Sequence, residues 1–181
     1  MTPEALASYE FHHDLTSFRP PAKQHKALIE IAKLPEGRII IARRGEVIVG
    51  YVTFLYPDPL ERWSEGNMEN LLELGAIEVI PEFRGFGVGK NFIDRLDDGR
   101  RHGRLYHHYN RILLALGFKT ARGLNVWEYR KVMEKMMNAG GLVWYATDDP
   151  EICSRSGELP HGPHWQTGRR RIDSTVRPAS V

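Results

Sequence analysis

With 181 residues, of which 41% are hydrophobic, the chain is long enough to bury one core, and we expect a single domain over residues 1–181. No apolar run approaches the roughly 20 residues that span a membrane, and the amino terminus lacks the basic start of a signal peptide, so we expect a cytoplasmic protein without a membrane partner. The single cysteine, Cys153, excludes an internal disulfide and a cysteine metal cluster.

The net charge of +2 hides an uneven distribution. Residues 91–123 hold seven Lys or Arg and three Asp or Glu, and residues 155–181 hold five and two, whereas the remainder is net acidic. Basic runs are usually solvated surface, and no aromatic stacking pattern accompanies these. We therefore expect no nucleic-acid partner.

Apolar spacing predicts two helices near the amino terminus, over Pro3–Phe11 and Gln24–Leu34. Pro20 and Pro21 separate them, because proline excludes continuation of a helix.

Two runs rich in β-branched and aromatic residues, Arg38–Arg44 and Glu46–Tyr56, are separated only by Gly45. This pattern predicts a hairpin of two strands. A third strand is predicted over Glu73–Ile80, and it leads directly into a segment rich in glycine.

Helical spacing returns at Asn125–Ala139, with Asn125 as the candidate N-cap. Two glycines then end the helix, and Leu142–Thr147 reads as a strand. We expect the methionines of this helix to pack in the core.

The glycine segment holds Gly85, Gly87 and Gly89, a spacing that suits neither of two common phosphate-binding motifs. An ATP-binding P-loop needs a glycine where Arg84 stands and a hydroxyl where Asn91 stands. A dinucleotide-binding loop needs a different glycine spacing within a parallel strand–helix–strand unit.

The pattern Arg-x-x-Gly-x-Gly at a strand-to-helix junction instead resembles the pyrophosphate-binding motif of the GCN5-related N-acetyltransferase superfamily. The resemblance implies acetyl-CoA as co-substrate and an α/β (α+β) fold in which a mixed, mostly antiparallel sheet is flanked by helices. Glycines let backbone N–H groups approach a pyrophosphate, and the helix N-terminus adds its positive dipole end. The residues implied to bind acetyl-CoA are Val79, Arg84, Gly85, Phe86, Gly87, Val88, Gly89 and Lys90.

Within this superfamily, long stretches of residues 9–91 and 124–154 closely resemble the acetoin-utilisation acetyltransferases of bacilli. This resemblance implies a protein-lysine N-acetyltransferase that inactivates acetyl-CoA synthetase by acetylation, in acetoin and butanediol breakdown. The family has a short strand before the first helix, so we expect a fold that is incomplete at both ends.

Residues 92–122 and about 155–181 do not resemble that family. Back-translated and read one base later, Tyr106–Lys119 becomes a β-branched strand followed by an aromatic run, and residues 156–181, which show no strand or helix pattern as written, gain one. We hypothesise that both segments are read out of frame; a divergent chain with unusual inserts is the alternative. In function, the alternative is a non-catalytic acetyl-CoA-binding protein or an inactive frameshifted product.

The resemblance also implies catalytic positions. Acetyl transfer to lysine needs a base for the ammonium proton and a donor for the oxyanion. The backbone N–H of Val79 is the implied oxyanion donor, and Glu73 or Glu78 is the implied base. The two glutamates have opposite parity along the strand, so we expect them to point to opposite faces. The tyrosine that protonates the leaving thiolate in many members falls at Met133, with Tyr129 as a weak substitute.

Two further groups of residues could have functional roles. His12, His13 and Asp14 could suggest a metal, but neighbouring residues on a helix point in different directions, so we expect surface or structural roles and no metal. The segment 57–67, with Trp63, lies where the resemblance places an acceptor-facing loop, and packing is the equal alternative.

Overall fold

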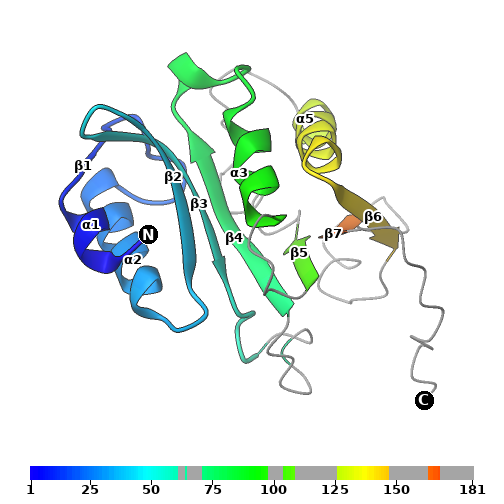
Figure 1. Ribbon diagram of the computed structural model, residues 1–181. Helices are drawn as coiled ribbons and strands as arrows, with labels where there is room; N and C mark the ends of the chain where they lie inside the picture. The colour runs from blue at the N-terminus through cyan, green and yellow to red at the C-terminus, as the bar shows by residue number, and fades with distance from the viewer. Residues whose placement is uncertain (61–63, 65–70, 98–103, 109–125, 147–162, 168–181) are drawn as a thin grey trace.

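The computed structural model describes residues 1–60, 64, 71–97, 104–108, 126–146 and 163–167. A seven-stranded sheet in the order β1-β3-β4-β5-β7-β6, with β2 also paired to β3, forms its centre (Figure 1). Among the described strands, β1–β3 and β4–β5 pair in parallel and the other pairs are antiparallel. The predicted mixed, mostly antiparallel sheet flanked by helices is confirmed.

Helices alternate with strands or runs of strands along the described part of the chain. They are α1 (Pro3–Ala7), β1 (Glu10–Phe11), α2 (Pro21–Lys33), β2 (Arg38–Arg44), β3 (Val47–Leu55), β4 (Leu71–Val79), a 3₁₀ turn (Pro81–Phe83), α3 (Val88–Asp97), β5 (Arg104–His108), α5 (Val126–Ala139), β6 (Leu142–Ala146) and β7 (Pro163–Thr167).

The amino-terminal helix is shorter than its apolar spacing predicts. α1 ends at Ala7, and Glu10–Phe11 instead pairs with β3 as the short strand β1. The backbone N–H of Glu10 donates to the carbonyl of Glu46 at 2.9 Å. Strand pairing therefore overrides the local helical pattern, and the predicted extension to Phe11 was wrong.

The second helix starts earlier than predicted. α2 begins at Pro21, with Pro20 as its N-cap residue, rather than at Gln24. Proline is well tolerated at the first helical position, where its missing N–H would have no partner within the helix. The proline pair thus starts this helix as well as separating it from the preceding segment.

A β-bulge in β4 changes the predicted orientation of its two glutamates. Glu78 lies opposite Tyr51 and Glu73 lies opposite Leu55, while the register skips Gly75. Tyr51 and Leu55 point to the same face of β3, because side chains alternate along a strand. The extra residue reverses the alternation of β4. Glu73 and Glu78 therefore share a face, and the predicted opposite orientation was wrong.

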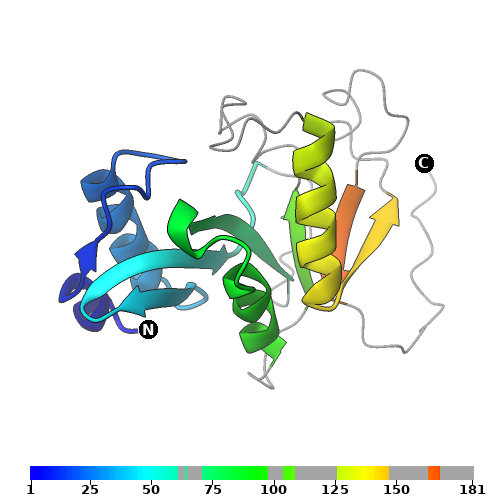
Figure 2. The same ribbon diagram turned by 90° about the horizontal axis from the view of Figure 1, so that it is seen from above.

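Two hydrophobic clusters cover opposite faces of β3 and β4. One packs α1, α2 and the β1–α2 segment against one face, and its buried members are Leu6, Leu15, Leu28, Ile39, Ile48, Val49, Tyr51, Ala76 and Ile80. The other packs α3 and α5 against the opposite face, with Val52, Phe54, Leu72, Leu74, Phe92, Ile93, Met133, Met137 and Leu142 buried. Viewed from above, α1 and α2 gather at the β1–β2 end and α5 lies at the β5–β7–β6 end (Figure 2).

Helix α5 confirms the predicted packing role of its methionines, because Met133 and Met137 are buried and Met136 packs against them. The predicted cap Asn125 and the strand end Thr147 lie outside the described residues. No helix in the described part of the chain has the length and apolar character that a membrane crossing requires.

The two segments suspected of a frame change contribute to the described fold. α3 continues into the first segment, where Phe92 and Ile93 are only 3% and 2% exposed. β5 pairs with β4 and with β7, so the absence of strand predicted for residues 156–181 was wrong at Pro163–Thr167. The other residues of both segments, 98–103, 109–122, 155–162 and 168–181, lie outside the described residues.

Candidate active site

The site is built around the point where β4 and β5 separate. In the described part of the chain, β5 pairs with β4 only at Leu71–Glu73. β4 continues to Val79, whereas β5 continues to His108 and there pairs with β7. β4 has two edges, and β3 pairs with one of them. Beyond Glu73, β5 no longer pairs with the other edge, which is therefore open in the described part of the chain.

The backbone of Val79 points toward this open edge. The N–H of the next residue, Ile80, donates to the carbonyl of Val49 on β3 at 3.0 Å. Because hydrogen-bonding groups alternate along an antiparallel strand, the N–H and C=O of Val79 face the opposite edge. Nε of Arg84 donates to the Val79 carbonyl at 2.7 Å. Arg84 thus fixes the end of β4 and leaves the Val79 N–H directed at the opening.

The glycine segment forms an open turn into α3. Gly85 and Gly87 have φ of 90° and 78°, in the left-handed region that glycine adopts without strain, and no heavy atom lies within 4 Å of a Cβ built on either. α3 begins at Val88 immediately after them. The first backbone N–H groups of a helix have no intrahelical acceptor, so this turn presents donors and the positive end of a helix dipole.

The other predicted residues of this segment divide into surface and packing positions. Phe86, at the tip of the turn, is 77% exposed, and Lys90 is paired with Asp94 one turn along α3. A Cβ on Gly89 would lie 2.5 Å from Sδ of Met136, so the third glycine allows α3 to approach α5 closely. Gly89 therefore has a packing reason that the motif alone does not reveal.

Glu73 is a buried carboxyl group at the point of separation. It is 7% exposed. Burial raises the pKa of Glu73 from 4.5 to about 7, and the negative charge of Asp58 adds to the rise. A carboxyl group with a pKa near neutrality can exchange a proton at physiological pH. Sequence reasoning missed Asp58, although it belongs to the proline-bounded segment that follows β3.

Glu78 is also buried, at 5% exposure, but both of its oxygens have donors. The backbone N–H of Ser17 donates to Oε1 at 2.8 Å, and the hydroxyl of Tyr51 donates to Oε2 at 2.9 Å. Glu78 therefore connects β4, β3 and the segment before α2. Sequence reasoning also missed Ser17 and Tyr51, because contacts across 61 and 27 residues leave no local pattern.

The candidate proton donor for the leaving thiolate lies on α5. Met133, where the tyrosine of many related proteins falls, is part of the buried core. Tyr129 packs one turn earlier, and burial raises its pKa, with Arg84 opposing the rise and Glu78 supporting it. The Tyr129 phenol therefore keeps its proton at neutral pH.

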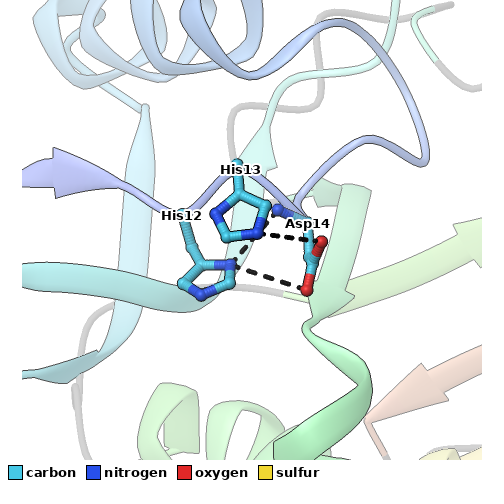
Figure 3. A group of neighbouring side chains, drawn as sticks. All are labelled: His12, His13 and Asp14. Atoms are coloured by element: carbon cyan, nitrogen blue, oxygen red, sulfur yellow. Dashed lines mark hydrogen bonds and ion pairs between the residues drawn. The ribbon is translucent and has the colours of Figure 1, made fainter.

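His12, His13 and Asp14 lie in a turn after β1 and not on a helix (Figure 3). Their ligand atoms lie within 4.8 Å of one another, and the two imidazole rings stack with centroids 4.4 Å apart. The predicted divergence of these side chains was wrong. The backbone N–H of Asp14 donates to Nδ1 of His12 at 3.2 Å, so part of this cluster stabilises the turn itself.

The predicted acceptor-facing segment 57–67 is described only in part. Trp63 and Cys153 lie outside the described residues. Leu60, in the described part, is fully exposed, and its backbone N–H donates to Oδ1 of Asp58 at 3.0 Å. That bond orders the segment beside Glu73.

The profile described as the acetyltransferase (GNAT) family matches residues 8–115. The chain is 60% identical over 161 residues to the acetoin utilization protein AcuA of Bacillus subtilis, covering 85% of this chain and 73% of that protein. The AcuA protein of Bacillus licheniformis is 61% identical over 163 residues, with the same coverage.

A solved structure supports the same relationship. The crystal structure of the acetoin utilization protein from Exiguobacterium sibiricum matches with a TM-score of 0.75 and 50% identity, over 92% of this chain and 76% of that one. The sequence identity to these relatives, the match to the family and the glycine turn at the open end of β4 all support the same relationship. The resemblance drawn from the sequence is confirmed. The chain belongs to the acetyltransferase (GNAT) family and is an N-acetyltransferase related to the acetoin utilization proteins of bacilli.

Proposed function

We propose that this acetyltransferase uses acetyl-CoA to acetylate a lysine of acetyl-CoA synthetase, and that the modification inactivates the synthetase during acetoin and butanediol breakdown. The observation that carries the proposed chemistry is the buried carboxyl group of Glu73, with a pKa of about 7, at the point where β4 and β5 separate. The relatives named for acetoin utilisation support the metabolic setting.

The residues around the glycine turn fit acetyl-CoA. The space at Gly85 and Gly87 is open, and the N-terminus of α3 supplies N–H donors for a pyrophosphate. When bound there, acetyl-CoA would supply an acetyl group activated as a thioester. Backbone groups of Val88, Gly89 and Lys90 would hold the phosphates, and the pairing of Lys90 with Asp94 keeps its ammonium at the side of the helix.

The reaction requires a neutral lysine amine and a stabilised oxyanion. Glu73 lies six residues before Val79 on β4, so it takes the proton from the lysine ammonium through a chain of water molecules, and the neutral amine nitrogen then attacks the thioester carbonyl. The N–H of Val79 donates to the carbonyl oxygen as negative charge develops on it. As the carbon–sulfur bond breaks, the phenol of Tyr129 on α5 donates its proton to the leaving thiolate.

Glu78 remains the alternative base, since it shares the face of β4 with Glu73 and lies next to Val79. Its two hydrogen bonds favour a supporting role, because both carboxylate oxygens are already held by donors from Ser17 and Tyr51. If Glu73 is the base, Glu73→Gln should lose activity, and if Glu78 is the base, Glu78→Gln should lose it.

The proposal is tested by incubating the purified protein with acetyl-CoA and a purified acetyl-CoA synthetase of a bacillus. We expect release of CoA, acetylation of one synthetase lysine by mass spectrometry, and loss of synthetase activity that requires both proteins and acetyl-CoA. Omitting acetyl-CoA is the matched control.

The second candidate is an acetyl-CoA-binding protein without transferase activity, or an inactive product of a frame change. Residues 155–181, which lie outside the family match, favour it, whereas residues 92–115 lie within the matched stretch, so the predicted departure of residues 92–122 from the family was wrong over that part. Saturable binding of acetyl-CoA by calorimetry, combined with no acetylation of the synthetase, would support this candidate and contradict the transferase.

A further inference from the structure

A buried hydrogen-bonded connection ties the β1–α2 loop, residues 12–20, to the centre of the sheet. Glu78 accepts the backbone N–H of Ser17 with one oxygen and the Tyr51 hydroxyl with the other. Tyr51 is fully buried, and burial beside the Glu78 carboxylate raises the pKa of Tyr51, so its hydroxyl remains a donor. The connection joins a strand in the core to a loop on the surface.

The loop lies at the end of β4 that carries Glu78 and Val79. At Val47 and Ile48, β3 pairs with β2 on one edge and with β1 on the other. The N–H of His12, just beyond β1, donates to the Ile48 carbonyl at 3.1 Å, and the N–H of Ile80 donates to the carbonyl of the adjacent Val49. The loop therefore begins beside the end of β4, next to Val79.

The loop also lies on the face from which an amine has to approach. Glu73 and Glu78 point to the same face of β4, on the side of α1 and α2. Ser17 contacts Glu78 on that face, and Leu15 is buried beneath the loop. The lysine amine has to come within bonding distance of the thioester carbonyl that the Val79 N–H would hold, and the loop lies beside Val79 on the face of the two glutamates.

We propose that Tyr51 is a positioning residue for acetyl transfer, which through Glu78 holds the β1–α2 loop in the place that admits the lysine-bearing segment of the protein acceptor. The inference rests on the proposed function. Tyr51 itself touches neither the acetyl donor nor the acceptor. Its hydroxyl fixes the Glu78 carboxylate, and the carboxylate in turn fixes the backbone of Ser17.

The test is Tyr51→Phe, which removes one hydroxyl and leaves the buried ring in place. A hydrogen bond to a buried charged group is one of the stronger bonds in a protein, and its loss leaves a carboxylate oxygen without its donor. We expect the KM for acetyl-CoA synthetase to rise about five- to tenfold while the KM for acetyl-CoA stays within about twofold. Hydrogen exchange of a peptide covering residues 12–20 should be faster by a similar factor.

Tyr9→Phe is the matched control, because Tyr9 packs against the same hydrophobic cluster and its ring lies under Arg43, away from Glu78. Ser17→Pro removes the donor from the other end of the connection, outside any helix or strand, and should reproduce the split between the two KM values. It provides a second test should Tyr51→Phe lower the melting temperature.

Equal KM values for wild type and Tyr51→Phe, or a rise of both KM values by the same factor, would overturn the inference while leaving the transferase intact. Unchanged exchange of residues 12–20 would overturn it as well. Failure of the wild-type protein to acetylate the synthetase is a different result, because it would contradict the proposed function itself.

Discussion

Glu73 concentrates the chemistry of the site in one buried carboxyl group. Its pKa of about 7 lies above the ordinary 4.5, so the folded protein binds this proton more tightly than the unfolded chain does. The stabilisation is complete below about pH 4.5 and is lost as the pH rises to about 7. Ionisation of Glu73 therefore destabilises the fold, and in the proposed mechanism the ionised form is the one that accepts the lysine proton.

Replacing Glu73 by glutamine should change how the free energy of unfolding depends on pH. The variant should unfold with about the same free energy as wild type at pH 4, and it should be more stable by roughly 2–3 kcal/mol at pH 8, where wild type carries a buried charge. Urea unfolding at the two pH values measures this difference. A stabilisation that is equal at both pH values would contradict the raised pKa.

Removing the charge of Asp58 should change the pKa of Glu73. This charge adds to the rise of the Glu73 pKa, so Asp58→Asn should lower that pKa and move the loss of stability to lower pH. The shift should be smaller than that caused by burial, which is the larger cause. Asp94→Asn, on α3 and paired with Lys90, is a control that changes the same charge on a different element. No difference between the two variants in the pH profile of unfolding would contradict the role of Asp58.

At the scale of elements, the turn from β4 into α3 depends on its left-handed glycines. Gly87→Ala should destabilise the protein by about 1 kcal/mol, because an alanine strains at a φ of 78°. It should also raise the Kd of acetyl-CoA, since the strained turn no longer presents its N–H groups. Calorimetric titration measures the affinity.

Gly45→Ala provides the matched control for this change. Gly45 has a φ of 59° in the turn between β2 and β3, with no heavy atom near its Cβ position. The two variants should lose similar stability, but only Gly87→Ala should lose affinity. Equal affinities would show that the turn is not part of the acetyl-CoA site.

The elements also show what the sequence could and could not predict. The hairpin of β2 and β3, the strand β4 and the glycine turn follow from local composition and spacing, and the structure has them. The bulge at Gly75 does not, because its position depends on packing between β3 and β4, and it moved Glu73 to the face of Glu78. The short strand β1 was missed for the same reason, since its pairing partner is more than 30 residues away.

In the whole molecule, the candidate site and the two suspect segments lie mostly in different parts of the sheet. The part built from β1 to α3 holds the candidate base, the candidate oxyanion donor and the glycine turn. The unusual segments contribute β5 and β7, which pair with each other and complete the sheet beside β4 and β6.

The out-of-frame hypothesis gives a prediction at this scale. The DNA across codons 88–125 and 150 to the end should show compensating single-base changes when both strands are read again. A chain with both segments restored should melt at a higher temperature than the chain as written, because β5 and β7 would then carry strand-forming side chains. DNA that encodes the sequence as written would refute the hypothesis.

The central claim is that Glu73 accepts the lysine proton in acetyl transfer from acetyl-CoA. The most direct measurement is the pH dependence of kcat/KM for wild type, Glu73→Gln and Glu78→Gln. The account predicts a wild-type rate that rises with pH to a plateau above about pH 7, the same rise for Glu78→Gln, and a rate at least about 100-fold lower without that rise for Glu73→Gln. A Glu73→Gln enzyme that keeps both the rate and the rise, or a Glu78→Gln enzyme that loses the rise, would contradict it.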